Sequence, residues 1–192
     1  MSDGRGPGQA KEEATAMTTV RPATAADIPE LAAIYNEVMA ASTAIFNDTP
    51  VTVENRLEWF EARRKQGFPV LVALDPHSGI AGFATFGDFR AWPGYRFTVE
   101  HSVHIRKDQR GQGIGRELML ALFPVATAMG KHVMIAGVDA SNSASLTFHE
   151  RLGFARIGTF REVGHKFGRW LDLTFLQKFL DAPGVPRTKT AR

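Results

Sequence analysis

The sequence predicts an α/β protein in which helices flank a mixed β-sheet within a single domain. Strand-like and helix-like segments alternate along the chain, its 192 residues suit one domain, and 44% hydrophobic residues are enough for a core. The predicted order is β-α-α-β-β-β-α-β-α-β-β. Residues 18–181 form the expected domain, residues 1–17 a disordered leader, and residues 182–192 a flexible basic tail.

The first half of the chain is predicted to contain a short strand, two helices and a hairpin. Asp27, with Glu30 three residues later, has the pattern of a capping box at the start of the first helix. In the second helix, Leu57 and Phe60 recur at helical spacing and are expected to face inward. The expected elements are a strand at Thr18–Arg21, helices from Asp27 and over Val53–Gln66, and paired strands at Pro69–Leu74 and Ile80–Phe86.

The second half is predicted to alternate strands and helices around a glycine-rich loop. The helix after this loop has apolar residues on one face from Ile114 to Met129. The other expected elements are a strand at Arg96–Arg106, a strand at Lys131–Val138, a helix at Ser143–Leu152, and closing strands at Phe154–Phe160 and Arg169–Phe179.

Composition excludes several classes of function. The chain has no cysteine, which rules out disulfides, thiolate zinc sites and cysteine nucleophiles. A net charge of +3 is too small to predict a nucleic-acid partner, and no apolar run approaches the ~20 residues of a membrane helix. His77, His132 and His165 lack metal-ligand spacing, so no metal site is predicted. Without a signal peptide, the protein is expected in the cytoplasm.

The strongest local signal is the glycine-rich loop Gln109–Arg116. Alternating glycines let successive backbone N–H groups face one concavity, and the following helix adds the partial positive charge of its N-terminus. Arg110 and Arg116 can add charge-assisted hydrogen bonds. The loop therefore predicts a phosphate or pyrophosphate site, with a flexible surface turn as the alternative.

Two other phosphate-binding motifs fit this loop less well. The ATP-type P-loop is excluded because Arg116-Glu117 follows Gly115, where that motif needs Lys-Ser or Lys-Thr. A dinucleotide site is the weaker alternative, because the glycines are spaced G-x-G-x-G and the charged run Arg106–Arg110 separates the strand from the loop. In that alternative Asp139 would bind a ribose, and the protein would be a nucleotide-binding oxidoreductase.

At this loop the sequence resembles the GCN5-related N-acetyltransferases, which bind acetyl-CoA. The run Arg110-x-x-Gly113-x-Gly115 matches their pyrophosphate loop, and Asn142–Phe154 resembles their second conserved block. Tyr95–Val103 and Lys166–Asp172 resemble the phosphinothricin and methionine sulfoximine acetyltransferase branch. The resemblance covers residues 18–180 and implies a splayed mixed sheet, acetyl-CoA as co-substrate and a homodimer.

The same resemblance implies a set of residues that contact acetyl-CoA. A bulge in the strand at Val103–Ile105 would free backbone groups to pair with the pantetheine amides. Asn142 starts the next predicted helix, where it can act as an N-cap and also bind the pantetheine. The implied cofactor-binding residues are Val103, His104, Ile105, Arg110, Gly111, Gln112, Gly113, Ile114, Gly115, Arg116 and Asn142.

Glu100 is the candidate base for acetyl transfer to an amine. Such a transfer requires removal of a proton from the amine and stabilisation of the oxyanion, and the thiolate can need a proton as it leaves. Glu100 lies in a strand of otherwise alternating apolar residues, where partial burial would raise its pKa. The resemblance implies that it is the base; a solvent-facing glutamate paired with Arg96 is the alternative.

His149 is the second candidate catalytic residue. Its ordinary pKa of about 6.5 suits proton transfer at neutral pH. The resemblance implies an acid for the thiolate at this position, where many members of the superfamily have tyrosine. The alternative is a half-exposed histidine, or one that hydrogen-bonds the amine. The sequence leaves open whether the roles of Glu100 and His149 are shared or swapped.

An anionic substrate is indicated by the residues that precede Glu100. Arg90, Tyr95 and Arg96 flank a Pro-Gly loop, and a guanidinium can bind a carboxylate or phosphinate through two hydrogen bonds. A polar loop with incidental arginines is the alternative. The resemblance adds Lys166 to the substrate-binding residues.

These observations predict an acetyl-CoA-dependent N-acetyltransferase. The resemblance implies direct transfer to the α-amino group of phosphinothricin, methionine sulfoximine or methionine sulfone, which would detoxify them. An acyl-CoA-binding sensor without catalysis is an alternative from another class, and a transferase acting on a different amine is a third possibility. A pocket that binds carboxylate through Arg90 and Arg96 predicts poor acceptance of peptides.

Overall fold

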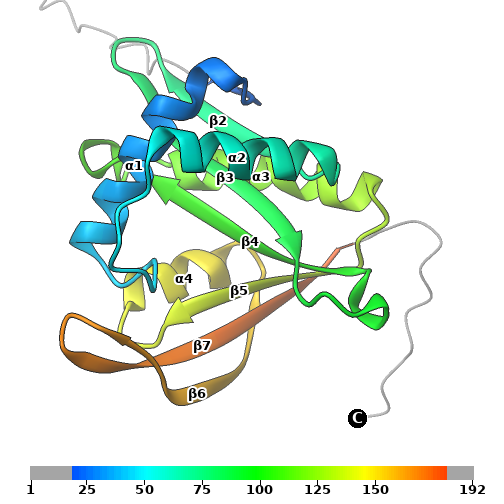
Figure 1. Ribbon diagram of the computed structural model, residues 1–192. Coiled ribbons are helices and arrows are strands. Elements are labelled where there is room, and N and C mark those ends of the chain that lie inside the picture. The colour runs from blue at the N-terminus through cyan, green and yellow to red at the C-terminus, as the bar shows by residue number, and fades with distance from the viewer. Residues whose placement is uncertain (1–18, 181–192) are drawn as a thin grey trace, which may run out of the picture.

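The computed structural model describes residues 19–180 (Figure 1). The predicted leader, residues 1–17, and the predicted tail, residues 182–192, lie outside the described residues. The order and type of the elements agree with the sequence-based prediction, and the α/β class with a mixed sheet is confirmed. Within the described part, no helix is long and apolar enough to cross a membrane.

The described chain forms helices and strands with boundaries close to those predicted. The strands are β1 Thr19–Pro22, β2 Val70–Asp75, β3 Gly79–Asp88, β4 Thr98–Ile105, β5 Val133–Asp139, β6 Ala155–Lys166 and β7 Arg169–Phe179. The α-helices are α1 Ile28–Ala41, α2 Val53–Lys65, α3 Ile114–Ala128 and α4 Ser143–Arg151. Short 3-10 turns lie at Ala25–Asp27, Pro93–Tyr95 and Lys107–Gln109.

The strands form one seven-stranded sheet in the order β1-β2-β3-β4-β5-β7-β6. Every neighbouring pair is antiparallel except β4 and β5, which are parallel. These two strands pair only between Thr98–Glu100 and Val133–Ile135. Beyond that point they diverge toward their C-terminal ends (Figure 1). The sheet is therefore split in its middle, as the predicted splay requires.

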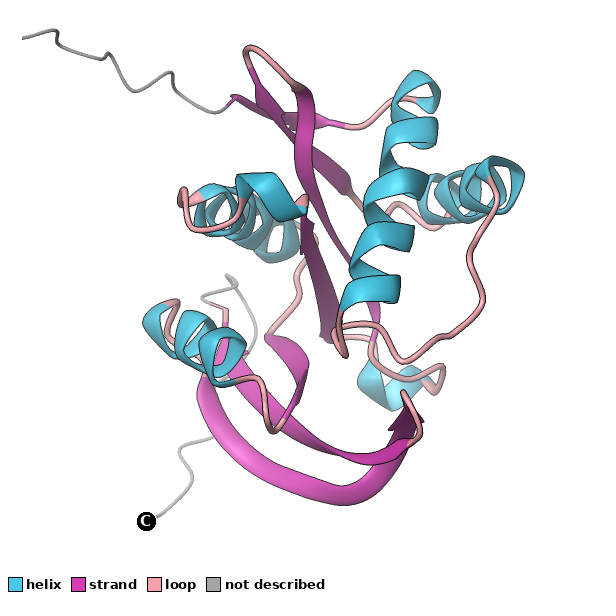
Figure 2. Ribbon diagram, turned by 90° about the vertical axis from the view of Figure 1, so that its left-hand side faces the viewer, coloured by secondary structure: helices cyan, strands magenta, loops and turns pink. Residues whose placement is uncertain are grey.

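Helices cover both faces of the sheet (Figure 2). Helices α1 and α2 pack on one face around Leu31, Val72 and Phe83. Helices α3 and α4 pack on the other face, where Leu118 and Leu146 join residues of β4, β5 and β7 in a second core. Burial of apolar side chains on both faces fixes the register of the strands beside the split, because a shift of one residue would exchange their side chains between the two faces and disrupt both cores.

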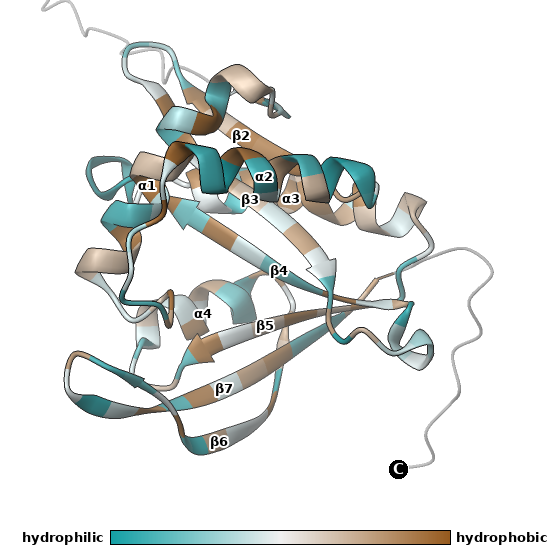
Figure 3. Cartoon of the chain, viewed as in Figure 1, coloured by the Kyte–Doolittle hydropathy of each residue, from teal (hydrophilic) through white to brown (hydrophobic). Residues whose placement is uncertain are grey.

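Helix α2 is more polar than the sequence pattern predicts. Phe60 is its buried side chain, whereas Leu57 is 39% exposed, so the prediction that Leu57 faces inward is wrong. Arginines and glutamates occupy most of the rest of the helix, and Figure 3 colours it largely hydrophilic. Phe60 therefore anchors α2 on the sheet together with the partly buried Trp59, and Leu57 does not add to that contact.

The predicted capping box lies one turn earlier than expected. The Asp27 carboxylate accepts hydrogen bonds from the backbone N–H of Thr24 (2.7 Å) and from both terminal nitrogens of Arg21 (2.7 and 2.8 Å). Glu30 instead accepts from the backbone N–H of Ile80, 2.9 Å away in β3. The Glu30 carboxylate thus binds a neighbouring strand and does not cap its own helix. The local sequence pattern does not reveal this contact.

Strand β6 is longer than predicted, continuing past Phe160 to Lys166. Its pairing with β7 shifts register between Phe160 and Gly164, and Glu162 has a positive φ of 52°. Most of β6 is exposed, so the strand lacks the apolar alternation that marks a half-buried strand in sequence.

Candidate active site

A cavity of about 230 Å³ lies at the split between β4 and β5. It is smaller than a pocket for a drug-sized ligand, and it suits the reacting ends of two substrates better than a whole coenzyme. Its walls come from β4, β5, β7, α4 with its N-cap, and the segment after α1. The lining residues are Thr43, Ala44, Phe46, Glu100, His101, Ser102, Val103, His104, Ala136, Gly137, Val138, Asp139, Asn142, Ser145, His149 and Leu173.

Glu100 lies at the last paired position of β4, where the split begins. Burial raises the pKa of its carboxyl, and the positive charge of Arg90 partly opposes that shift. The alternative pairing with Arg96 is not observed, because that guanidinium donates to the carbonyl of Pro93 (3.1 Å) and stacks on the ring of Phe97. A half-buried carboxylate with a raised pKa is suited to accept a proton from an amine.

Gly137 leaves the space that the Glu100 carboxylate occupies. A Cβ atom at Gly137 would lie 3.1 Å from Oε1 of Glu100, 3.5 Å from Leu173 and 3.6 Å from Phe175. The backbone of β5 therefore approaches the Glu100 carboxylate closely. A glycine inside a strand is a recognised sign of such an approach, and this signal in the sequence was missed.

His149 is buried on α4, which contradicts the alternative of a half-exposed histidine. Its Nδ1 is 2.7 Å from the carbonyl oxygen of Ser145, and this contact assigns the proton of the neutral ring to Nδ1. The Nε2 atom is buried and has no partner among the described residues. Burial lowers the pKa of His149, and the Ser145 carbonyl opposes that shift. The Nε2 is thus the ring nitrogen that remains available to a bound group.

His101, which sequence reasoning did not single out, also lines the cavity. Its ring lies 5.1 Å from that of His149 and 5.5 Å from that of Phe154, measured between centroids. Both of its ring nitrogens are buried without partners. Burial lowers the pKa of His101 well below its ordinary value, so its ring is neutral. His149 therefore lies beside an uncharged imidazole.

The cavity connects the two faces of the sheet. Successive side chains of a strand point to opposite faces, so Glu100 and His101 face opposite sides, yet both line the cavity. His149 belongs to the face that carries α3 and α4. A carboxylate is therefore available from one face and an imidazole from the other, with the split between them.

The edge of β4 that faces the split lacks a neighbouring strand beyond Glu100. Val103 and His104 line the cavity there. The implied bulge at Val103–Ile105 is absent, since β3 and β4 pair in unbroken register from Gly82–Ile105 to Asp88–Val99. The divergence of β5 exposes this edge instead, so the backbone can still pair with an amide-containing arm.

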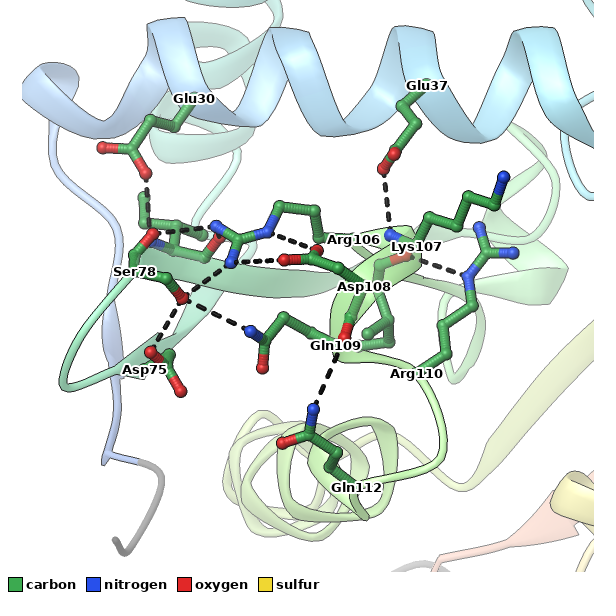
Figure 4. Close-up of polar contacts among 12 residues, drawn as sticks. Glu30, Glu37, Asp75, Ser78, Arg106, Lys107, Asp108, Gln109, Arg110 and Gln112 are labelled. Carbon is green, nitrogen blue, oxygen red and sulfur yellow. Dashed lines mark hydrogen bonds and ion pairs between the residues drawn. The ribbon is translucent and has the colours of Figure 1, made fainter.

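The glycine-rich loop rests on a polar network beneath it (Figure 4). Arg106 binds Asp108 through its Nε (2.7 Å) and Ser78 through both terminal nitrogens (2.8 and 2.6 Å). Glu37 of α1 accepts a hydrogen bond from the backbone N–H of Lys107 (3.0 Å). The start of the loop is thereby fixed to α1 and to the β2–β3 turn.

The loop itself presents unpaired donors. Gly111 and Gly113 have φ angles of 80° and 84°, which favour glycine. The backbone N–H groups from Gly111 to Gly115 make no backbone hydrogen bond to another described residue, and α3 begins at Ile114. Arg110 uses Nε on the carbonyl of Ile105 (3.2 Å) and keeps two terminal nitrogens free. These free donors suit a pyrophosphate, whose oxygens would satisfy them.

Asn142 and Asp139 lie where β5 leads into α4. The Oδ1 of Asn142 accepts from the backbone N–H of Ser145 (3.0 Å), so the residue is an N-cap and lines the cavity as well. The Asp139 carboxylate accepts from the Thr43 hydroxyl and from the Ser141 N–H and hydroxyl (both 2.9 Å). Because these groups occupy both of its oxygens, Asp139 is poorly placed to bind a ribose.

None of the four predicted substrate-binding residues, Arg90, Tyr95, Arg96 and Lys166, lines the cavity. Arg90 acts electrostatically on Glu100, and Tyr95 lies against Phe89, with 5.9 Å between ring centroids. Arg96 is stacked on its neighbour Phe97, outside the cavity lining. Lys166 is buried, and its ammonium binds three backbone carbonyls. The charge of Arg90 thus opposes the rise that burial causes in the pKa of the candidate base, whereas the ammonium of Lys166 is already satisfied by backbone carbonyls.

A split mixed sheet, a free strand edge, a pyrophosphate-type loop and a buried carboxylate together define an acyl-CoA-dependent transferase. Residues 18–155 match the family described as acetyltransferase (GNAT) domain. The chain belongs to this family and is an N-acetyltransferase that uses acetyl-CoA. The predicted family, fold and co-substrate are thus confirmed.

Three relatives illustrate the match. The chain is 51% identical over 163 residues to an L-methionine sulfoximine/L-methionine sulfone acetyltransferase of Pseudomonas paraeruginosa, covering 85% of this chain and 95% of the relative. A putative acetyltransferase from Salmonella typhimurium, solved with acetyl-CoA, has a TM-score of 0.83 and 45% identity, covering 88% and 98% of the two chains. A phosphinothricin acetyltransferase from Sinorhizobium meliloti in complex with acetyl-CoA has a TM-score of 0.84 and 34% identity, covering 90% and 94%.

Proposed function

We propose that the protein transfers the acetyl group of acetyl-CoA to the α-amino group of a small amino-acid-like substrate of the methionine sulfoximine, methionine sulfone or phosphinothricin type. The convergence of Glu100 and His149 on one small cavity at the split carries this proposal. Relatives named for these substrates support the substrate class. Acetylation removes the basic amine, and the product is a detoxified amide.

Glu100 is proposed as the base that removes the proton of the amine. An ammonium has no lone pair, so the proton must leave before or during attack. The raised pKa of Glu100 makes the carboxylate a stronger proton acceptor than an exposed glutamate. No protein nucleophile is required, which agrees with a chain that contains no cysteine.

His149 is proposed to act on the opposite side, where the thiol leaves. Its Nδ1 is occupied by the Ser145 carbonyl, so proton exchange with a reacting group must use Nε2. Neutral His149 holds its only proton on Nδ1, and a donor role at Nε2 therefore requires prior protonation there. Starting from the ammonium, the nitrogen loses two protons as the amide forms. One of them ends on the thiolate, which leaves as free CoA thiol, and the other is released to solvent.

The cofactor site is proposed to run from the glycine-rich loop along the free edge of β4. When bound, acetyl-CoA supplies an acetyl thioester that an amine can attack. The N–H groups from Gly111 to Gly115 would hold the pyrophosphate, and the backbone of Val103–Ile105 would align the amide-containing arm. Alignment of two reactants in this way lowers the entropic cost of the reaction.

The anionic part of the substrate is proposed to lie near Arg90. This guanidinium is close enough to Glu100 to oppose the rise of its pKa, and a substrate carboxylate beside it would neutralise its charge. A carboxylate-binding cation next to the base favours amino acids over polyamines, which carry no anionic group.

Release of free CoA thiol from acetyl-CoA tests the proposal, with methionine sulfone, phosphinothricin, a lysine peptide and a polyamine as acceptors. We expect turnover with the first two only. Turnover with the peptide or polyamine instead would keep the acetyltransferase and overturn the substrate assignment. No turnover in any assay, with acetyl-CoA still bound, would favour the sensor without catalysis.

We further propose a homodimer that acts in the cytoplasm, where acetyl-CoA is supplied. Strand β6 is an edge strand, and several large apolar side chains on the β6–β7 hairpin are exposed. An exposed edge of this kind is usually covered in soluble proteins, and a second copy of the chain would cover it. The exposed apolar residues of the hairpin are Ile157, Phe160, Val163, Phe167, Trp170 and Phe179.

A further inference from the structure

Lys166 is a fully buried lysine near the end of β6. It is 1% exposed, and its Nζ donates to the carbonyl oxygens of Met39 (2.5 Å), Ser42 (2.9 Å) and Ile45 (2.7 Å). An ammonium group has three N–H donors, and these three acceptors satisfy all of them. None of the ion pairs among residues 19–180 involves Lys166. Its charge is therefore balanced by carbonyl dipoles.

The three carbonyls belong to the end of α1 and the segment that follows. Met39 lies in the last turn of the helix, and Ser42 is its C-cap residue. The last carbonyls of a helix lack intrahelical partners and carry partial negative charge, so a cation there is favourable. The bonds join residues 121 to 127 positions apart in sequence. Lys166 thus fixes the direction in which the chain leaves α1.

The segment that Lys166 holds is one wall of the active-site cavity. We name residues 42–46 the acceptor wall, because Thr43, Ala44 and Phe46 line the cavity together with Glu100. The Thr43 hydroxyl donates to the Asp139 carboxylate, which ties the wall to β5. A second contact joins the wall to β6, where the ring of Phe46 lies so close to Gly164 that an added Cβ atom would clash with it.

We propose that Lys166 is a positioning residue that sets the affinity for the amine substrate by holding the acceptor wall in place. This inference rests on the proposed function, which assigns the cavity to the amine. Lys166 does not touch the cavity and acts through the backbone of residues 39–45. We name the three hydrogen bonds of Lys166 the clamp. The glycine-rich loop and α3 lie in other elements and supply the proposed cofactor site, so binding of acetyl-CoA does not depend on the clamp.

The test uses Lys166→Met, which keeps most of the side-chain volume and removes the charge and all three hydrogen bonds. The matched control is Lys178→Met on β7, whose ammonium lies over the ring of Phe123, 5.1 Å from its centroid, on the opposite face from the wall. We expect KM for methionine sulfone to rise at least about tenfold in Lys166→Met, with kcat and the Kd for acetyl-CoA changed less than about threefold. The control should leave all three unchanged.

A second variant reaches the same wall without altering Lys166. In Gly164→Ala the added methyl group displaces the ring of Phe46 and leaves the three ammonium bonds intact. It should also raise KM for the amine selectively. If Lys166→Met does not fold, as judged by circular dichroism, Gly164→Ala decides the question. An unchanged KM for the amine, or an equal loss in affinity for acetyl-CoA, would overturn the proposal.

Hydrogen exchange separates this inference from the proposed function. Backbone amides of residues 43–46 should exchange faster in Lys166→Met than in wild type and in Lys178→Met, whether or not methionine sulfone is acetylated. If wild type fails to acetylate methionine sulfone but exchange accelerates, the substrate assignment fails and the clamp stands. Unchanged exchange in a folded Lys166→Met variant would overturn the clamp even if the sulfone is a substrate.

Discussion

The two candidate catalytic residues lie at the split of the sheet, one on each face. Glu100 and His149 reach the cavity from opposite sides, and both are buried enough for their pKa values to shift toward each other. Burial raises the pKa of an acid and lowers that of a base, so both shifts have the same cause. An acidic limb in the pH profile could therefore arise from either residue.

Replacement of Glu100 by Gln should identify the base. In wild type, kcat/KM for methionine sulfone should rise with pH as the Glu100 carboxyl, whose pKa is raised, loses its proton. We expect Glu100→Gln to lower kcat/KM roughly 100-fold and to abolish this limb, because the amide cannot accept the proton. The pH profile of His149→Gln is the comparison. If the limb persists in Glu100→Gln and disappears in His149→Gln, the base is His149.

At the scale of elements, helix ends and strand ends meet through polar side chains. Glu37 of α1 fixes the start of the glycine-rich loop, and Lys166 of β6 fixes the end of the same helix. Asp27 secures the beginning of α1 by binding Arg21 of β1 and the N–H of Thr24. Both ends of α1 are thus determined by partners from other elements.

The contact at the start of α1 predicts a pH-dependent stability. The pKa of Asp27 is lowered from 3.8 to about 2, chiefly by the hydrogen bond from Arg21. Burial raises this pKa and so opposes the shift, and the hydrogen bonds from Thr24 lower it further. A pKa lowered by folding adds stability above the unfolded value, and this stability is lost as pH falls toward the folded value. We expect Asp27→Asn to lower the free energy of unfolding by about 1 kcal/mol at neutral pH, allowing for the exposure of Arg21.

Urea unfolding of both proteins at neutral pH and at about pH 3 checks this expectation. The difference between wild type and Asp27→Asn should shrink at the lower pH, where the carboxylate of the wild type has begun to lose its advantage. A difference that is the same at both pH values would show that the Asp27 charge does not stabilise the fold.

At the scale of the whole molecule, the β6–β7 hairpin is the most exposed part of the described sheet. Trp170 is 64% exposed and Ile157 is 62% exposed, although both are large apolar residues. Leu173 of the hairpin lines the cavity, and Lys166 of the hairpin donates hydrogen bonds to the acceptor wall. A partner bound to this hairpin would therefore lie close to the elements that shape the amine site.

Replacement of Ile157 by Lys should weaken the proposed homodimer. A charge on the exposed edge strand would be desolvated in the interface, so we expect the dimer dissociation constant to rise at least about tenfold in sedimentation equilibrium. Leu120→Lys, which places the same charge at an exposed apolar position on α3, is the control. A monomeric wild type, or equal effects of both variants, would contradict dimerisation through this hairpin.

Much of the fold and part of the site could be read from local patterns. The order of the elements follows from their periodicity, and the glycine-rich loop follows from glycines whose positive φ angles other residues rarely adopt. Asn142 behaves as an N-cap, as its position predicts. These features depend on residues close together in the chain, so local sequence is enough to predict them.

The partners of several side chains come from distant parts of the chain and are visible only in the folded structure. Lys166 reaches carbonyls more than 120 residues away, Glu30 binds β3 in place of its own helix, and Leu57 remains exposed on a polar helix. The unpaired edge of β4 arises from the divergence of β5 and requires no bulge. A local pattern fixes which groups a segment offers, but the partner of a buried charge or an open strand edge depends on which segments the packed sheet brings together.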